Sequence, residues 1–522
     1  MPRLVNQQLF DKFLRERSTL LLSLAKKLVL EGAECMELSR PCLGVIQAEA
    51  TQLEELLDAY GARNNLQWYP FRMQIAILKN FSTAGYELLH LLHTSRGYSL
   101  DSLQDEFHQH TADAINYVSA FIFCALKRLL QEGKNFSWPS PEDNLGFDFS
   151  ENLPIGHLPR DRKGVSGATA NELIIKLATG FLNITEDAAF LQIAAKSKPP
   201  KWSEVDFHRI GEASLRALEG KIHNLQSTYD TYISDSDTET GDNNVPRLRE
   251  HISIVLHLLR VGTIFAHFYE RHFKINAGAL FCNANCVLAS DWFMELFVHY
   301  LCHYSYKFMD NARSLCQSIL KKYAVIETVS IPVPPYFGFH VRPSVLVSSI
   351  VMHYGSKVTM ICDASKYDAK NTMDLWRTNE WINQKKRQYI SETISKMDLS
   401  EIISKIDSKA ISTEDGVLAV IRMLAGQGAV RLLRYPLPVA PLLTKLAKSD
   451  KSLFALTLDV ISTLHTHRYL SILLEVKADF RGDIRVLRDL GILAEHSYGE
   501  NEFGTNIPLP PELDYLNNYR QQ

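Results

Sequence analysis

A histidine and an arginine two residues apart stand where the sequence predicts the start of a helix. The segment 338–343 reads Gly-Phe-His-Val-Arg-Pro; it follows a strand-like run at 325–333 and precedes an apolar segment of helical spacing. The first backbone N–H groups of a helix have no partner within the helix and carry the positive end of its dipole, so they stabilise an anion. A guanidinium adds a planar cation that binds two phosphate oxygens. The pattern therefore predicts a phosphoryl site, with His340 as acceptor and Arg342 stabilising the phosphate.

This stretch resembles the active-site loop of the histidine-containing phosphocarrier protein (HPr) family of the bacterial sugar phosphotransferase system. In that family the order is Gly, an aliphatic residue, His, a small residue, Arg and Pro. Gly338, His340 and Arg342 match, as does the proline that follows, whereas Phe339 and Val341 are bulkier than is usual for the family.

The resemblance implies a carrier role with no cofactor and no substrate pocket. The donor would be Enzyme I charged by phosphoenolpyruvate, and the phosphate would be carried on a ring nitrogen of His340 and held by the backbone N–H groups of Val341 and Arg342. Partners of the known carriers dock on an exposed apolar patch beside the histidine. Three residues lie at the matching positions here: Val345, Thr372 and Met373.

The order of elements downstream sets the expected domain. A helix from 343 to 354 and a strand at 357–362 fit the family, and the pattern then breaks near residue 376. It resumes with a helix at 415–424, a strand at 429–435 and a last helix at 438–448. We therefore expect an HPr-like domain at 325–450 with an insertion near 376–413, because surface insertions of about 40 residues cost little in loop closure. Residues 451–522 are expected to be a C-terminal helical extension and tail.

The first 323 residues predict helix after helix. Apolar stripes of helical spacing recur and short connectors join them, which favours a bundle. A stretch rich in Pro, Gly and Asp at 137–167 suggests a boundary between helical domains at 1–150 and 165–323. The expected fold class is α+β: a mainly helical N-terminal region, then an HPr-like open-faced β-sandwich with a helical insertion.

Composition and charge limit the classes of binding partner that we expect for this protein. The chain has 522 residues, of which 46% are hydrophobic and 22% charged, and a formal net charge of −3. It has no dense Lys/Arg cluster of the kind nucleic-acid-binding proteins show. No run approaches the ~18 uncharged apolar residues that span a bilayer. Eight scattered cysteines do not suggest a disulfide framework. These features predict a cytoplasmic protein that binds an Enzyme I-like donor and an acceptor or regulatory target, with no nucleic acid and no membrane span.

Two alternatives remain open. Cys282, Cys286, His299 and His303 have the spacing of a two-Cys, two-His zinc site, although a chain of this size does not need a zinc ion for stability. The other alternative is a non-catalytic helical interaction scaffold in which a degenerate HPr-like domain only docks partners. Labelling of His340 would separate the carrier from the scaffold, and metal analysis would test the zinc site.

Overall fold

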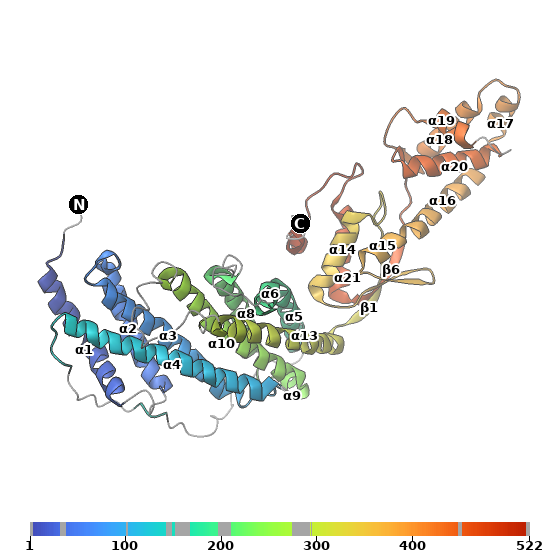
Figure 1. Ribbon diagram of the computed structural model, residues 1–522. Coiled ribbons are helices and arrows are strands. Elements are labelled where there is room, and N and C mark those ends of the chain that lie inside the picture. Colours follow the sequence, from blue (N-terminus) through green and yellow to red (C-terminus); the bar gives the residue numbers. More distant parts are fainter. Residues whose placement is uncertain are drawn as a thin grey trace. The chain divides into compact units, whose positions relative to one another are not determined.

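The computed structural model describes residues 4–31, 38–100, 103–141, 149–151, 168–196, 210–273, 293, 295–446 and 451–517. The chain divides into two compact units, Met1–Lys322 and Tyr323–Gln522. Figure 1 shows the first unit built from helices and the second from helices and strands. The expected α+β class with dominant helix is therefore confirmed at that level.

In its described residues, the first unit contains helices and no strands. Those with more than seven residues are α1 (Gln7–Glu31), α2 (Arg40–Ala59), α3 (Tyr69–Ser95), α4 (Gln104–Asn135), α5 (Ala168–Asp187), α6 (Ala189–Lys196), α8 (Glu212–Tyr232), α10 (Asn244–Phe268), the π-helix η5 (Glu295–Cys302) and α13 (His303–Tyr323). Shorter pieces are η1 (Ala62–Asn64), α9 (Asp237–Gly241) and the π-helical turn η4 (Tyr269–Phe273).

Helices from both sides of the expected boundary at residue 150 share one core. α3 packs against α2, α4 and α10. Phe81 of α3 stacks on Phe121 of α4 and lies 5.4 Å, between ring centroids, from Phe265 of α10. The Pro- and Gly-rich stretch does not separate two cores, so the expected division into 1–150 and 165–323 is replaced by one unit.

Among the described residues, one helical segment has the length and apolar composition to cross a bilayer. It covers Asn244–His272, and 83% of its most apolar window is buried inside the unit. Burial on this scale is what the central helix of a bundle needs, which explains its composition without a membrane.

The second unit is built on a four-stranded antiparallel sheet. Its strands are β1 (Ile326–Pro332), β2 (Thr359–Cys362), β3 (Ser365–Asp368) and β6 (Lys477–Asp483), in the spatial order β1-β6-β2-β3. β6 lies in the middle, pairing Val329 with Phe480 on one side and Phe480 with Met360 on the other.

Helices cover one face of this sheet. They are α14 (Val341–Tyr354), α15 (Thr372–Arg377) and α21 (Ile484–Glu495). Along β6 the buried residues Ala478 and Phe480 alternate with exposed Lys477 and Asp479, as expected for a sheet buried on one side. The buried residues of β6 join apolar residues of the three helices, such as Leu346, in one core.

The position of β6 corrects the expected boundaries. The run at 429–435 does form a strand, β4 (Val430–Leu432), but β4 pairs with β5 (Leu470–Ile472) in a separate two-stranded sheet. Residues 477–483, which were expected to lie in a C-terminal extension, provide the central strand instead. The insertion therefore runs from about residue 378 to 476 rather than from 376 to 413, and no boundary falls at 450.

The insertion has its own core and an internal repeat. It contains α16 (Asn379–Ser395), α17 (Ser400–Asp407), α18 (Thr413–Gly426), α19 (Val439–Leu446) and α20 (Leu453–Thr466). α18 and α20 are both 14 residues long, and each begins after a serine cap, Ser412 or Ser452. A strand follows each helix, so the unit α17-α18-β4 recurs as α19-α20-β5 about 40 residues later.

The pairing of the two strands follows the same offset. Arg431 pairs with Ser471, which stands 40 residues further on. Leu433 N–H donates to Tyr469 O, and Leu473 N–H donates to Ala429 O, so equivalent residues exchange equivalent bonds. The two repeats are therefore related by a local pseudo-two-fold axis through the β4–β5 pair.

Candidate functional site

His340 stands immediately before α14, as the sequence predicts. It is the N-cap residue, with extended backbone (φ −84°, ψ −171°). The first helical hydrogen bond runs from Ser344 N–H to His340 O, so α14 does not use the amides of Val341 and Arg342. The two amides that the sequence assigns to a phosphate thus lie at the positive end of a 14-residue helix. That helix ends at Gly355 in the left-handed conformation, again as expected.

The loop before His340 is fixed by a residue of the insertion. Asn379 Oδ1 accepts from Phe339 N–H at 2.7 Å, and Asn379 Nδ2 donates to Phe339 O at 3.1 Å. Gly338 has φ +65°, and a Cβ there would lie 2.2 Å from Asn379 Oδ1. Glycine is therefore required for both backbone conformation and space. Phe339 is fully buried against Tyr498, which accounts for the bulky residue at this position.

A buried carboxylate contacts the candidate phosphoryl acceptor. Both oxygens of Glu500 lie close to His340 Nε2, at 2.9 and 2.8 Å. The Glu500 side chain has no exposed surface, whereas 29% of the His340 side chain is exposed. A carboxylate only accepts hydrogen bonds, so this contact places a proton on Nε2. In the neutral ring, Nδ1 then carries the lone pair.

Backbone turns hold Glu500 in place. Ser497 and Tyr498 both have positive φ, and Tyr498 OH donates to Pro332 O at 2.6 Å, at the end of β1. Beyond Glu500 a tight turn returns the chain, with Asn501 N–H donating to Thr505 O. The carboxylate therefore comes from a loop that is held against the end of β1, and the chain after β1 leads into the loop that carries His340.

Arg342 also contacts this loop. Its Nη1 donates to Glu500 Oε2 at 3.2 Å and to Gly504 O at 3.1 Å. About a third of the Arg342 side chain is exposed. The guanidinium is thus directed toward Glu500, and its other nitrogens make no hydrogen bond to the described residues.

The insertion borders the site with two further arginines. Arg468 stacks on the ring of Phe337, with its Cζ 4.0 Å from the centroid, and the Phe337 ring lies 6.2 Å from that of His340. Arg431 pairs with Glu502 at 2.6 Å. Arg431 lies in β4, and Arg468 lies in the turn between α20 and β5.

The residues expected to dock partners lie on two neighbouring helices. Val345 of α14 and Met373 of α15 are exposed, and Thr372 is half-buried. Val341 and Trp376 add exposed apolar surface, with 79% and 57% of each residue accessible. Exposed apolar side chains gathered beside a polar site are typical of interaction surfaces.

The zinc prediction rests partly outside the described residues, which include neither Cys282 nor Cys286. His299 lies 4.0 Å from Glu295, and His303 begins α13. No group of three or more ligand side chains forms a metal site in the described part of the chain. Cys124 of α4 is disulfide-bonded, which the scattered cysteine spacing did not indicate.

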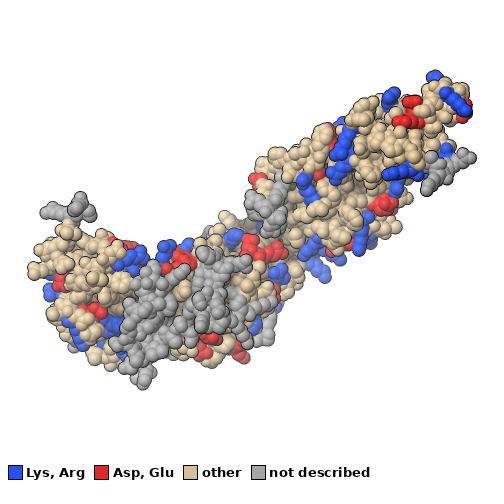
Figure 2. Space-filling view, turned by 45° about the horizontal axis from the view of Figure 1, so that its top comes forward, with Lys and Arg blue, Asp and Glu red and all other residues tan. Residues whose placement is uncertain are grey.

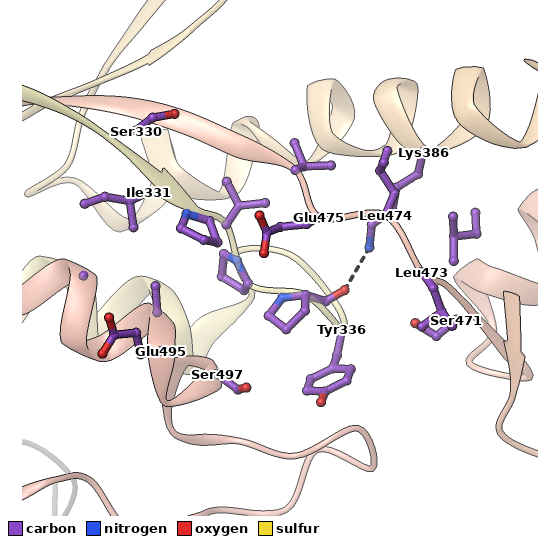
Figure 3. A pocket seen from close by; sticks show the side chains of 18 of the residues that line it. Ser330, Ile331, Tyr336, Lys386, Ser471, Leu473, Leu474, Glu475, Glu495 and Ser497 are labelled. Atoms are coloured by element: carbon purple, nitrogen blue, oxygen red, sulfur yellow. Dashed lines mark hydrogen bonds between the residues drawn. The ribbon is translucent and has the colours of Figure 1, made fainter. Parts of the chain in front are cut away.

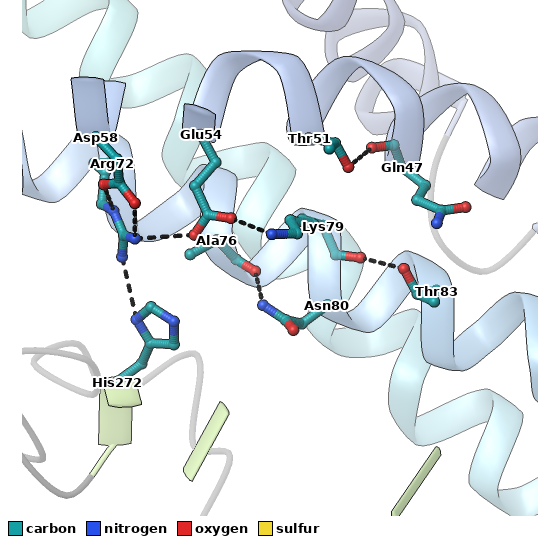
Figure 4. Close-up of polar contacts among 10 residues, drawn as sticks. All are labelled: Gln47, Thr51, Glu54, Asp58, Arg72, Ala76, Lys79, Asn80, Thr83 and His272. Carbon is teal, nitrogen blue, oxygen red and sulfur yellow. Dashed lines mark hydrogen bonds and ion pairs between the residues drawn. The ribbon is translucent and has the colours of Figure 1, made fainter. Parts of the chain in front are cut away.

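An ion-pair network surrounds Arg72 in the first unit (Figure 4). Arg72 is 3% exposed; it binds both oxygens of Asp58 at 2.8 Å and Glu54 at 3.0 Å. Its Nη1 lies 3.2 Å from Nδ1 of buried His272. Burial, reinforced by the Arg72 charge, lowers the pKa of His272 to about 3, so this histidine is neutral at physiological pH. The cluster joins α2, α3 and η4, and its charges are paired, so we assign it to the core.

Charges of both signs are interspersed over the face drawn in Figure 2.

Comparison with family models, with curated proteins and with solved structures finds no match to this chain.

Proposed function

We propose that the second unit is an HPr-like phosphoryl carrier. Its family pattern is interrupted after α15 by a large insertion and is completed by β6 and α21. The support is the antiparallel order β1-β6-β2-β3, the three helices on one face, and the histidine that caps α14. The observation that carries the proposal is the contact of His340 Nε2 with the buried carboxylate of Glu500.

The chemistry follows from that contact. The Nδ1 lone pair attacks the donor phosphorus; the Nδ1–P bond forms as the bond from phosphorus to the donor breaks, and the donor keeps that electron pair. Positive charge that develops on the ring is stabilised by the carboxylate at Nε2, which also holds the ring in place. The amides of Val341 and Arg342 and the guanidinium would bind the transferred oxygens.

The test uses the full chain with Enzyme I and phosphoenolpyruvate. We expect one acid-labile phosphate per chain, with a 31P NMR shift typical of Nδ1-phosphohistidine, and none in His340→Ala. His467→Ala is the matched control, since His467 is an exposed histidine at the end of α20 and should not affect labelling. Labelling that survives in His340→Ala, or that falls equally in His467→Ala, contradicts the proposal.

One observation favours the scaffold alternative. Glu500 already accepts from His340 Nε2 and Arg342 Nη1, so each side chain has an anionic partner without phosphate. A pure docking unit would use only the exposed apolar residues Val341, Val345, Met373 and Trp376. Absence of labelling, with partner capture that is equal in wild type and His340→Ala, would establish this alternative.

A further inference from the structure

A pocket of about 640 Å³ lies on the side of the second unit where the insertion joins the sheet. Its walls come from the end of β1 and the loop after it, from α16, from the segment between β5 and β6, and from α21. Figure 3 shows Lys386 reaching from α16 toward the loop, with Tyr336 and Ser497 nearby. The volume is in the range of small-molecule sites.

The walls are mainly apolar, and their backbone groups are largely satisfied. Prolines 332, 334 and 335 supply no N–H group. Pro332 O accepts from Tyr498 OH, and Val333 N–H donates to Val476 O. The loop therefore presents hydrocarbon surface to the pocket, with few donors to solvate an anion.

Unlike the apolar wall, Lys386 brings a charged group to the pocket. It is 2% exposed, and its ammonium donates to Pro335 O at 3.0 Å. No carboxylate among the described residues lies within ion-pair distance of its Nζ. An ammonium has three donors, and a buried one without a counter-ion is unfavourable. Burial lowers the pKa of Lys386 to about 8, so the amine is still mostly protonated at pH 7.

The neighbours of Lys386 do not neutralise it. Burial, together with the nearby charge of Lys386, lowers the pKa of His465 to about 4, so His465 is neutral at pH 7. Glu475 lines the pocket but pairs with Lys477 at 2.9 Å on the exposed side. Glu495 is an exposed residue of the lining. The single ammonium and the two lining carboxylates favour a ligand with one negative charge over a phosphate dianion.

We propose that this pocket binds a small organic acid, with its carboxylate on Lys386 and its hydrocarbon body against the proline wall. The carboxylate supplies the missing counter-ion, and the apolar body displaces water from the proline and aliphatic side chains. This site is separate from the phosphoryl site and does not depend on phosphotransfer by His340.

Calorimetric titration of the full chain tests the site with octanoate as the probe and octanol as its uncharged analogue. We expect octanoate to bind the wild-type protein at least tenfold more tightly than octanol, since a charge-assisted contact to a buried ammonium contributes about that factor. Lys386→Met keeps the length and apolar character of the side chain and should abolish this preference. Lys385→Met is the matched control: Lys385 precedes Lys386 in α16, its side chain is 40% exposed and paired with Asp363, and its loss should leave octanoate binding unchanged.

Three results would overturn the proposal: no octanoate binding to wild type, equal binding of octanoate and octanol, or undiminished preference for octanoate in Lys386→Met. The comparison of the two probes on wild type does not depend on any variant, so it decides the question even if Lys386→Met does not fold.

Discussion

At the scale of single residues, the site is a triad in which a buried carboxylate holds a histidine and an arginine. Glu500 accepts hydrogen bonds from His340 and Arg342 while its own side chain is fully enclosed. Removing one partner of a buried charge leaves it poorly compensated, which costs more than the lost bond. Each member of the triad therefore affects both stability and the chemistry of the ring.

We expect Arg342 to contribute both to the stability of the fold and to the phosphorylation of His340. Arg342→Ala leaves Glu500 with the His340 N–H group but without a cationic partner, so we expect a loss of about 1–3 kcal/mol in the free energy of unfolding. Phosphohistidine brings close to two negative charges, whereas the helix dipole offsets about half a unit. The phosphorylated fraction at equilibrium with the donor should therefore fall roughly ten- to a hundredfold.

Arg342→Lys should restore part of this loss, because a point charge cannot replace the two-pronged contact. Arg481→Ala, which removes an exposed arginine from β6, is the control and should label like wild type. Phosphorylation of Arg342→Ala to the wild-type level would show that Arg342 does not contact the phosphate.

Glu500 can be tested through the ring protons of His340. Glu500→Gln keeps the size of the side chain but removes the charge, so the Nε2–H form of the ring loses its strongest acceptor. We expect two-dimensional 1H–15N NMR to show the Nε2–H tautomer in wild type and a mixture of tautomers in the variant. Phosphorylation by the donor should slow about tenfold, the effect expected of a charge-assisted hydrogen bond. An unchanged tautomer and rate would remove Glu500 from the mechanism.

At the scale of elements, local patterns located the parts of the site that lie close together in the sequence. β1, α14, β2 and the Gly355 cap of α14 all fall within two residues of their expected positions. Each has a local cause: a strand-like run, a helix-initiating proline, an apolar stripe of period 3.6 or a glycine stop. The sequence therefore located His340 at the start of a helix.

Long-range pairing was not predictable in the same way. β6 contains only two apolar side chains in seven residues, those of Ala478 and Phe480, so it gives a weak strand pattern. The more apolar run at 429–435 fits a strand better, but periodicity does not say which strand it pairs with. Glu500 lies 160 residues from His340 in a segment with no helical or strand pattern, and no local signal connects the two.

The loop before α14 gives a prediction about glycine. Gly338→Ala should lower the free energy of unfolding by about 1–3 kcal/mol, since alanine is strained at φ +65° and its Cβ would meet Asn379 Oδ1. Asn379→Ala removes the contact but not the strain, so the double variant should lose less than the sum of the two single losses. Chemical denaturation measures all three variants.

Gly426→Ala is the control for that series. Gly426 ends α18, and a Cβ there meets nothing within 4 Å. Alanine is the better helix former, so this variant should be neutral or slightly more stable. A Gly338→Ala protein as stable as Gly426→Ala would mean that the loop relaxes without cost.

At the scale of the whole molecule, each unit buries groups whose charged forms are unfavourable. In the second unit the pKa of Lys386 falls from 10.5 to about 8 through burial. Between these pH values the unfolded chain binds a proton that the folded chain has released, so stability should rise as pH rises from about 8 to 10.5. The full span corresponds to about 3 kcal/mol. Lys386→Met should remove this rise and should be more stable than wild type at pH 7, because it buries no charge.

Acid should act on each unit through histidines whose pKa is lowered by burial, and the shift is large for His272 in the first unit and His465 in the second. Burial, with a nearby cation as the next cause, lowers the pKa of His272 to about 3 in the first unit and of His465 to about 4 in the second. Below pH 6.5 the unfolded chain takes up a proton at each position that the folded chain refuses, so stability is lost as pH falls from 6.5 toward these values. For His465 the loss amounts to about 3 kcal/mol over the whole interval.

Calorimetry of the full chain between pH 7 and 4.5 measures this dependence. His465→Gln should flatten the pH dependence of unfolding of the second unit and leave that of the first unchanged, so the first unit is an internal control. Carboxylates in ion pairs elsewhere also titrate in this range. The quantity to compare is therefore the difference in the pH dependence of unfolding between wild type and His465→Gln. If the two have parallel pH profiles, His465 is protonated in the folded protein, and Lys386 then has a charged neighbour. A second cation beside the Lys386 ammonium would favour a carboxylate ligand further, so octanoate should then bind more tightly as pH falls below 6.5.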